Sequence, residues 1–100
     1  MVEKMIVKVV GNYSENDWQN NRTGEKKLIK SIQVVLKNGR EGVVAEASGE
    51  LAEKIRDMKL KVDTPVLVNL SFDYQEVTKD NVVRYFQRVR IEDLVLQDLV

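Results

Sequence analysis

The first half of the chain alternates apolar, mostly β-branched runs with polar, turn-forming residues, a pattern typical of β-strands. Three such runs predict strands over residues 5–10, 26–36 and 41–47. Between the last two runs, the dipeptide Asn38-Gly39 is the strongest short signal for a hairpin turn. Residues 11–25 are nearly all loop formers, so we expect a long loop there that is functional or mobile.

In one segment the apolar residues recur with the spacing of a helix rather than of a strand. Leu51, Ile55 and Met58 are spaced four and then three residues apart, which places them on one face of a helix. Ser48 is a candidate N-cap for this helix, and acidic residues occupy its first turns, where the helix dipole favours them. We therefore expect one helix that ends near Lys59 and packs its apolar face on the core.

The second half of the chain returns to strand patterning. After a break at residues 63–65, residues 66–74 alternate strictly between apolar and polar positions, and a polar stretch over residues 75–81 leads to a last strand over residues 82–96. The predicted order is β-β-β-α-β-β, in a single domain that spans residues 1–100. The residues expected in the core are Leu51, Ile55, Val66, Val68, Leu70 and Val89, with Tyr13 and Phe72 as further candidates.

The sequence contains neither cysteine nor histidine. These residue types supply thiol nucleophiles, thiolate metal ligands and the commonest general base. A phosphate-binding glycine loop and the spaced oxygen ligands of a calcium loop are also absent from the sequence. We therefore expect a protein that is not an enzyme, with no catalytic residues, no metal site and no cofactor.

The first residues break their apolar positions with charges and lack the apolar stretch of a secretory signal. No apolar run approaches the roughly 20 residues that cross a bilayer. We therefore expect a cytoplasmic protein that does not bind membranes.

A net charge of zero conceals an uneven distribution of charge. The chain has 16 basic and 16 acidic residues. Residues 1–40 carry eight basic and four acidic side chains, a balance of +4, so residues 41–100 carry −4. Within that acidic remainder, Arg84, Arg88 and Arg90 form a second basic cluster. Together the two basic segments indicate one positive face, although each cluster alone is equally consistent with ordinary solvated charge.

The last strand carries the most informative pattern. Alternation gives it one face suited to a core and a second face that combines arginines with a phenyl ring. Arginines that pair with phosphates around a ring that stacks on bases are typical of surfaces for single-stranded nucleic acid. Val83, Tyr85, Gln87, Val89 and Ile91 form the first face, and Arg84, Phe86, Arg88 and Arg90 form the second.

An alternative for this second face is structural. Phe86 would pack under a neighbouring loop, and the arginines would pair with acidic residues nearby. The candidate acidic partners are Asp73, Glu76 and Glu92.

Trp18 is a second candidate contact, because it lies in a polar loop with no apolar neighbour in sequence. The alternative is that it packs back as an anchor over the mouth of the fold or lies in a subunit contact. Lys26 and Lys30 share the parity of the core positions on their strand, so a bulge or twist must turn them outward. The basic residues expected to contact phosphates beside Trp18 are Arg22, Lys26, Lys27 and Lys30, and Tyr74 is a third aromatic candidate.

Over essentially its whole length the chain resembles the OB-fold single-stranded DNA-binding proteins of phages and mobile elements. The resemblance lies in the order of elements, the polar loop closed by Arg22-Thr23-Gly24, the basic start of the second strand, and the aromatic and arginine last strand. It implies a five-stranded Greek-key barrel with the helix between its third and fourth strands. It also implies binding of single-stranded DNA without sequence preference, during replication or transfer. Residues 92–100 do not match the long acidic tail of cellular single-strand-binding proteins, so recruitment of partners through a tail is not expected.

A rival hypothesis from another class is a non-catalytic adaptor or structural subunit of a protein assembly. Trp18 and the apolar C-terminal segment would then be protein contacts. The zero net charge favours this rival, whereas the uneven charge and the arginines around Phe86 favour nucleic acid. These residues do not distinguish DNA from RNA, because both present bases and phosphates, and it is the resemblance that favours DNA over RNA. Because one OB-fold barrel covers only ~4 to 16 nucleotides, we also expect a homodimer.

Overall fold

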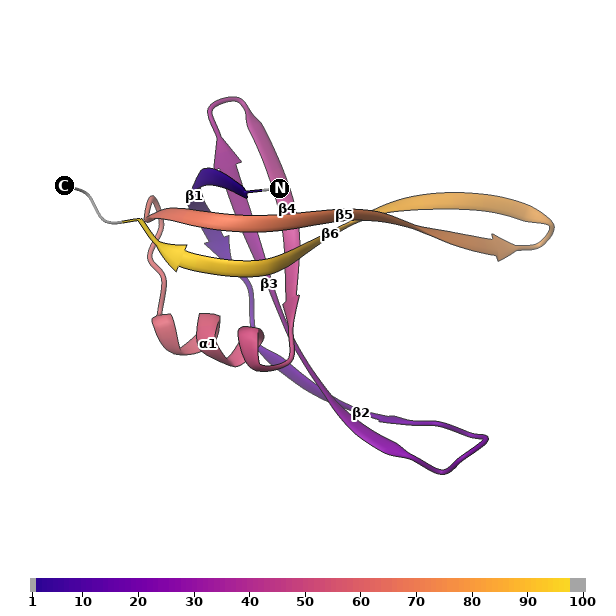
Figure 1. The fold of residues 1–100 in the computed structure, drawn as a ribbon. Helices are drawn as coiled ribbons and strands as arrows, with labels where there is room; N and C mark the ends of the chain where they lie inside the picture. Colours follow the sequence, from indigo (N-terminus) through magenta and orange to yellow (C-terminus); the bar gives the residue numbers. More distant parts are fainter. Residues whose placement is uncertain (1, 98–100) are drawn as a thin grey trace.

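The computed structural model describes residues 2–97, which form six strands and one helix (Figure 1). The expected class, mostly β with a single helix, is confirmed for these residues. The strands are β1 (Val2–Val10), β2 (Ser14–Gln19), β3 (Lys26–Asn38), β4 (Glu41–Ser48), β5 (Pro65–Lys79) and β6 (Val82–Leu96), and the helix is α1 (Glu50–Met58).

The strands form one sheet that closes on itself. Their order across the sheet is β1, β5, β6, β4, β3, β2, and a further antiparallel pairing between β1 and β3 closes a ring of five strands. β2 lies outside the ring, where it pairs with β3. The pairing between β4 and β6 is parallel and joins Glu46 to Arg90, whereas the other pairings are antiparallel.

Tight turns join the two longest hairpins. β3 and β4 connect through residues 39–40, with Gly39 at a φ of 62°, so the hairpin predicted from Asn38-Gly39 is confirmed. β5 and β6 connect through Asp80 and Asn81, whose φ angles are 53° and 64°. Positive φ at both central residues is the type I′ geometry, which matches the twist of the flanking strands and which Asp and Asn tolerate.

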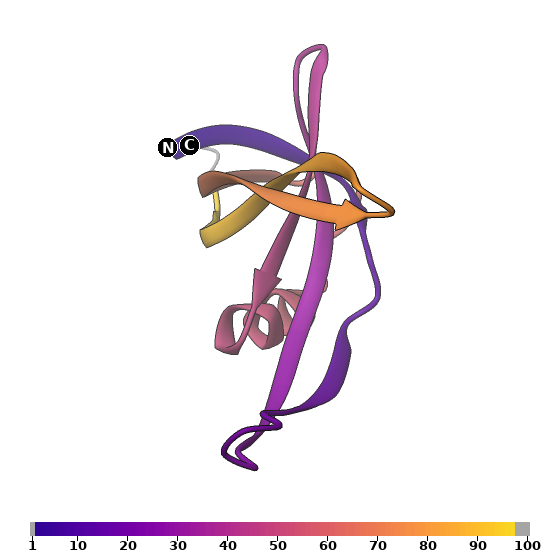
Figure 2. The same ribbon diagram turned by 90° about the vertical axis from the view of Figure 1, so that its right-hand side faces the viewer.

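Two hairpins extend beyond the ring as arms (Figures 1 and 2). The β2–β3 arm consists of β2 and the first part of β3, and the β5–β6 arm consists of residues 72–88, which are all exposed. The Cα radius of gyration is 15.7 Å, above the roughly 13 Å of a compact chain of this length. The arms account for this excess, because they project in different directions from the ring.

The core fills the ring from one face of each strand, and α1 covers one end of it with Ala52 and Ile55 (Figure 1). A β-bulge near Glu92 changes the parity of β6, so that both Ile91 and Leu94 point into the core. The buried residues are Met5, Val7, Ile32, Val34, Leu36, Ala45, Ala47, Ala52, Ile55, Val66, Val68, Leu70, Val89, Ile91 and Leu94. The expectation of burial is confirmed for Ile55, Val66, Val68, Leu70 and Val89, while Leu51 and Tyr13 are partly buried against the core.

The prediction of five strands in the order β-β-β-α-β-β is wrong by one strand. Residues 14–19, expected to be loop, form β2 because they pair in continuous register with the first half of β3. The polar residues 75–79, expected to connect strands, continue β5 because each faces a partner on β6. Both segments are strands because their backbones pair with a neighbouring strand, although their residues favour loops.

Two further expectations are wrong. The helix N-cap is Gly49 and not Ser48, since the chain enters α1 at a φ of 66° and a ψ of −141°, a conformation that glycine adopts easily. Phe72 is 51% exposed and lies outside the core, because β5 leaves the ring just after Leu70.

Leu70→Ala should destabilise the fold by ~2 to 5 kcal/mol, because it leaves a cavity in the packed ring. Leu70 is only 2% exposed. Urea unfolding followed by circular dichroism measures the loss. Leu28→Ala is the matched control, since Leu28 is 51% exposed on the β2–β3 arm and its truncation should change stability by less than ~0.5 kcal/mol. Equal losses in the two variants would show that the core is placed wrongly.

Candidate nucleic-acid interface

The arginine face of β6 consists of Arg84, Phe86, Arg88 and Arg90, which alternation places on one side of the strand. On the neighbouring strand β5, Val77 lies opposite Arg84 and Gln75 lies opposite Phe86. Phe86 is 50% exposed, and all four residues are on the surface. The grouping predicted from the sequence is therefore present, on the outer side of the β5–β6 arm and its base.

The arginines of this face are free of ion pairs within residues 2–97. Asp73, directly opposite Arg88, instead accepts a hydrogen bond from the backbone N–H of Tyr74. Glu92 accepts one from the hydroxyl of Ser71. The alternative in which neighbouring acidic residues neutralise the arginines is therefore wrong for this structure, and a bound phosphate would not have to displace such a partner.

Trp18 lies on the β2–β3 arm, opposite Lys27 on β3. Trp18 is 43% exposed, and the Lys27 ammonium lies 5.9 Å from the centroid of its ring, within the range of a cation–π contact. Ile29, 44% exposed, projects from the same face of this arm. Trp18 is therefore not an anchor packed over the core, and an aromatic ring and an ammonium group are presented together.

One continuous sheet face connects these two groups. Lys27, Ile29 and Gln33 are alternate positions of β3, and Gln33 lies opposite Glu46 on β4. Where β4 and β6 run parallel, Glu46 lies opposite Arg90 in the backbone register. The outer face of β3, β4 and β6 therefore runs from Trp18 to the arginine face without a change of side, and we call it the outer face.

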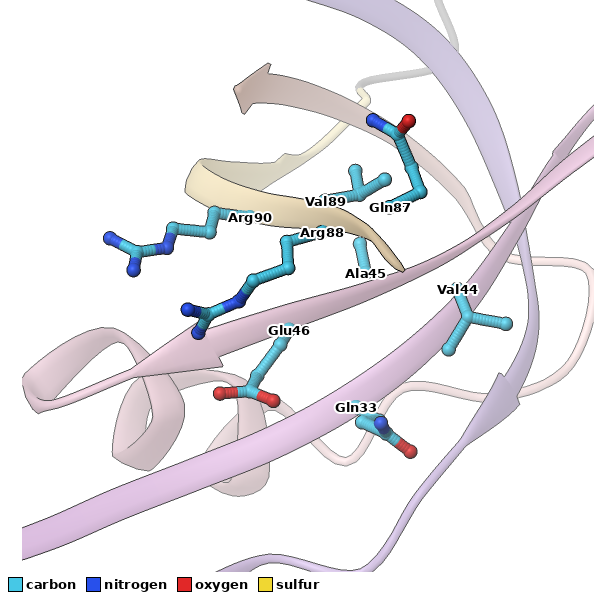
Figure 3. A pocket seen from close by; sticks show the side chains of 8 residues that line it. All are labelled: Gln33, Val44, Ala45, Glu46, Gln87, Arg88, Val89 and Arg90. Carbon is cyan, nitrogen blue, oxygen red and sulfur yellow. The ribbon is translucent and has the colours of Figure 1, made fainter. Parts of the chain in front are cut away.

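A hollow in the surface marks the middle of the outer face (Figure 3). Arg88 and Arg90 extend in one direction from β6, over the end of β4 that carries Glu46 (Figure 3). The hollow therefore combines two guanidinium groups, one carboxylate and two side-chain amides. Its lining residues are Gln33, Val44, Ala45, Glu46, Gln87, Arg88, Val89 and Arg90.

Helix α1 braces the base of the β2–β3 arm. Lys30 forms a 2.6 Å ion pair with Glu53, and the hydrogen bond of this pair raises the pKa of Lys30. The Arg56 guanidinium stacks over the Tyr13 ring at 4.4 Å. The Tyr13 hydroxyl donates a 2.7 Å hydrogen bond to Glu15 on β2. These contacts hold the arm in a fixed direction relative to the ring.

Four predicted site residues lie off the outer face. Lys26 and Lys30 project from the other face of the β2–β3 arm, and Lys30 is engaged by α1. The register with β2 is continuous, so no bulge turns these lysines outward; they lie on the part of β3 that precedes the core, which begins at Ile32. Arg22 is in the exposed turn at the tip of that arm, and Tyr74 is on the side of the β5–β6 arm opposite Phe86.

The central residues of the outer face were missed from the sequence. Gln33, Val44 and Glu46 belong to strands that were predicted, but their role depends on which strands become neighbours. Alternation could have found them: Val44 is 55% exposed between core positions, which is unusual for valine in a strand.

Comparison with known proteins gives no family assignment. No family model matches the chain, and no curated protein matches it significantly. Within residues 2–97 no three cysteine, histidine or acidic side chains lie together in a way that could hold a metal ion. In the same part of the chain no helix has the length and apolar character needed to span a membrane.

The Tyr13 contacts predict an alkaline transition. Partial burial and the hydrogen bond to Glu15 raise the pKa of Tyr13 from 10.0 to about 12. Because the folded-state pKa is the higher one, this stabilisation is complete below pH 10 and is lost as the pH rises through 12. In an absorbance titration of tyrosinate, Tyr13→Phe should remove a component near pH 12. Tyr85→Phe, which should keep that component, is the control; the reverse result would contradict the assignment.

Proposed function

We propose that the ring is an OB-fold. Counting β1, β3, β4, β5 and β6 as its five strands, the chain follows the Greek-key order of that fold, with the helix between the third and fourth strands and one parallel closure. β2 then belongs to an extended loop between the first two strands of the fold. In OB-folds the ligand face is the outer surface of the second and third strands together with the loops at either side, and here β3, β4 and the two arms occupy these positions.

On this fold we propose a protein that binds single-stranded nucleic acid without sequence preference, with DNA favoured over RNA. It has no catalytic function and protects or organises single strands during replication or transfer, as the resemblance to phage and mobile-element proteins implies. The observation that carries the proposal is the arginine face, in which three guanidinium groups without an ion pair among residues 2–97 lie on the same side of β6 as the half-exposed Phe86. Such a surface neutralises phosphates and offers a stacking platform that accepts any base.

The length of the outer face fits a short single strand. Six residues of β3 separate Lys27 from Gln33, two strand spacings lead to Arg90, and four residues of β6 lead to Phe86. At about 3.3 Å per residue and about 4.8 Å between strands, this path measures roughly 40 Å. A strand of several nucleotides, within the ~4 to 16 covered by one OB-fold, would span it from Trp18 to Phe86.

The rival function is a non-catalytic adaptor or structural subunit. It is favoured by the exposed apolar side of the β5–β6 arm, and by Val95 and Leu96, which are 38% and 54% exposed near the C-terminal end of β6. Trp18 would then contact protein, and an oligonucleotide would leave its emission unchanged.

The fluorescence of Trp18 tests the proposal directly, because Trp18 is the only tryptophan in the sequence. Short oligo-dT should quench its emission, and Phe86→Ala should weaken binding by ~1 to 3 kcal/mol through loss of a stacking platform. Tyr85→Ala, on the opposite side of the same strand, is the matched control and should leave the affinity for short oligonucleotides unchanged. Unaltered emission from folded protein at saturating oligonucleotide would refute the proposal and favour the adaptor.

The arginines predict a salt-dependent affinity. The logarithm of the affinity should fall with the logarithm of the salt concentration by about 0.7 for each phosphate neutralised. Arg84→Ala and Arg88→Ala should each reduce this slope by about one phosphate contact. Lys61→Ala, an exposed lysine in the connection between α1 and β5, serves as the control and should keep the wild-type slope. A slope independent of both arginines would place the ligand elsewhere.

A further inference from the structure

The β5–β6 arm has a second surface, opposite the arginine face, which we call the inner face. It continues the parity of the core residues Leu70 and Ile91 beyond the ring, where no core remains to receive it. Its apolar members are Phe72, Tyr74, Val83 and Tyr85, which are 51%, 65%, 45% and 67% exposed. The rings of Tyr74 and Tyr85 meet edge to face with their centroids 6.1 Å apart. Such a contiguous exposed aromatic surface marks an interaction site.

The charges of the arm are divided between its two faces. The inner face of the arm carries one charged residue, Glu76, and two uncharged polar residues, Thr78 and Gln87. The cations of the arm project from the opposite face or lie near the turn. A polyanion would meet a carboxylate and no cation on the inner face, so its occupant is apolar rather than a nucleic acid.

The arm also lacks a third structural element. β1 pairs with β5 only as far as Asn69, and β4 meets β6 only at Arg90, among residues 2–97. Between these points and the turn, the arm is a two-stranded hairpin exposed on both faces. Isolated hairpins are marginally stable in water, and a layer packed on an apolar face supplies the missing stabilisation.

We infer that the inner face is a homodimer interface, on which the same face of a second copy packs. If the two arms run antiparallel about a twofold axis, one register places Tyr74 of each copy opposite Glu76 of the other. The pairing of β5 with β6 then also places Tyr85 opposite Gln87, and along β5 the same register places Phe72 opposite Thr78. In this register the Tyr74 hydroxyl donates a hydrogen bond to the Glu76 carboxylate, and the other two contacts set an aromatic ring against an amide or a hydroxyl side chain. The face is therefore complementary to itself, without opposed like charges.

The size of the inner face sets the strength of this dimer. A fully exposed aromatic side chain presents on the order of 150 to 250 Å², so three rings at half to two-thirds exposure and Val83 offer roughly 400 Å² per copy. The total of roughly 800 Å² lies below the roughly 1,200 Å² at which stable specific interfaces begin and in the range of weak, transient ones. The dimer should therefore dissociate on dilution.

In this arrangement the arginine faces of the two copies point away from the interface. Each outer face stays accessible, so dimerisation and binding of nucleic acid use separate surfaces. The inference therefore does not depend on the proposed function, and either can fail without the other.

Sedimentation velocity over a dilution series, without nucleic acid, tests the inference. Wild-type protein should sediment as a species of twice 11.5 kDa at high concentration and dissociate on dilution. The double variant Tyr74→Ser with Tyr85→Ser should remain monomeric at concentrations where the wild type is dimeric. Val77→Ser with Phe86→Ser makes an equivalent change on the opposite face of the same arm and should leave the dimer intact. Circular dichroism melts confirm that each variant is folded.

Four results would overturn the inference. Wild-type protein that is monomeric at every concentration shows that two copies do not pair through this face. A dimer that survives the tyrosine substitutions, or is lost in the control variant, places the interface elsewhere. Quenching of Trp18 by short oligo-dT should persist in the tyrosine variant; its loss while the protein stays dimeric would make the inner face a ligand surface instead.

Discussion

The structure depends on the length of β3, which pairs with three different strands. Its first half pairs with β2 and its second half with β4, while residues 34–37 also pair with β1 on the other edge. Pairing on both edges closes the ring, and the unshared first half projects as an arm. A shorter β3 would close the ring without an arm, or form the arm without closure. The same strand therefore determines both the core and the position of Trp18.

Side chains of one parity lie on the same face along a whole strand, but that face is buried only where the strand borders the core. On β5, Leu70 is buried and Phe72 is exposed, although both have the same parity. On β3, Ile32 is buried while Leu28 is exposed for the same reason. Strands longer than the core thus carry core-like residues into solvent, where they become available for partners. The aromatic inner face of the β5–β6 arm is a direct result.

The local elements were predicted more accurately from the sequence than the pairing between strands. Strong local signals placed the helix stripe at Ile55, the hairpin at Gly39 and the alternating faces of the last strand, because these depend on neighbours in the chain. β2 was missed since its residues favour loops, and only pairing with β3 makes them a strand. Gln33 and Glu46 were missed because their juxtaposition depends on the parallel pairing of β4 with β6. One strand of the β2–β3 arm was therefore predicted as a loop. The centre of the outer face was not predicted, although both strands that form it were.

The net charge of zero does not weigh against binding a polyanion once the charges are assigned to faces. Lys30 is paired with Glu53, Lys8 with Asp63 and Arg56 with Asp57, so these cations are already compensated within the fold. The three arginines of the arginine face have no such partner within residues 2–97. At physiological salt, where fields are screened over about 8 Å, a ligand responds to the unpaired charges nearest to it and not to the sum over the molecule. Local pairing, rather than composition, therefore decides which surface can attract phosphate.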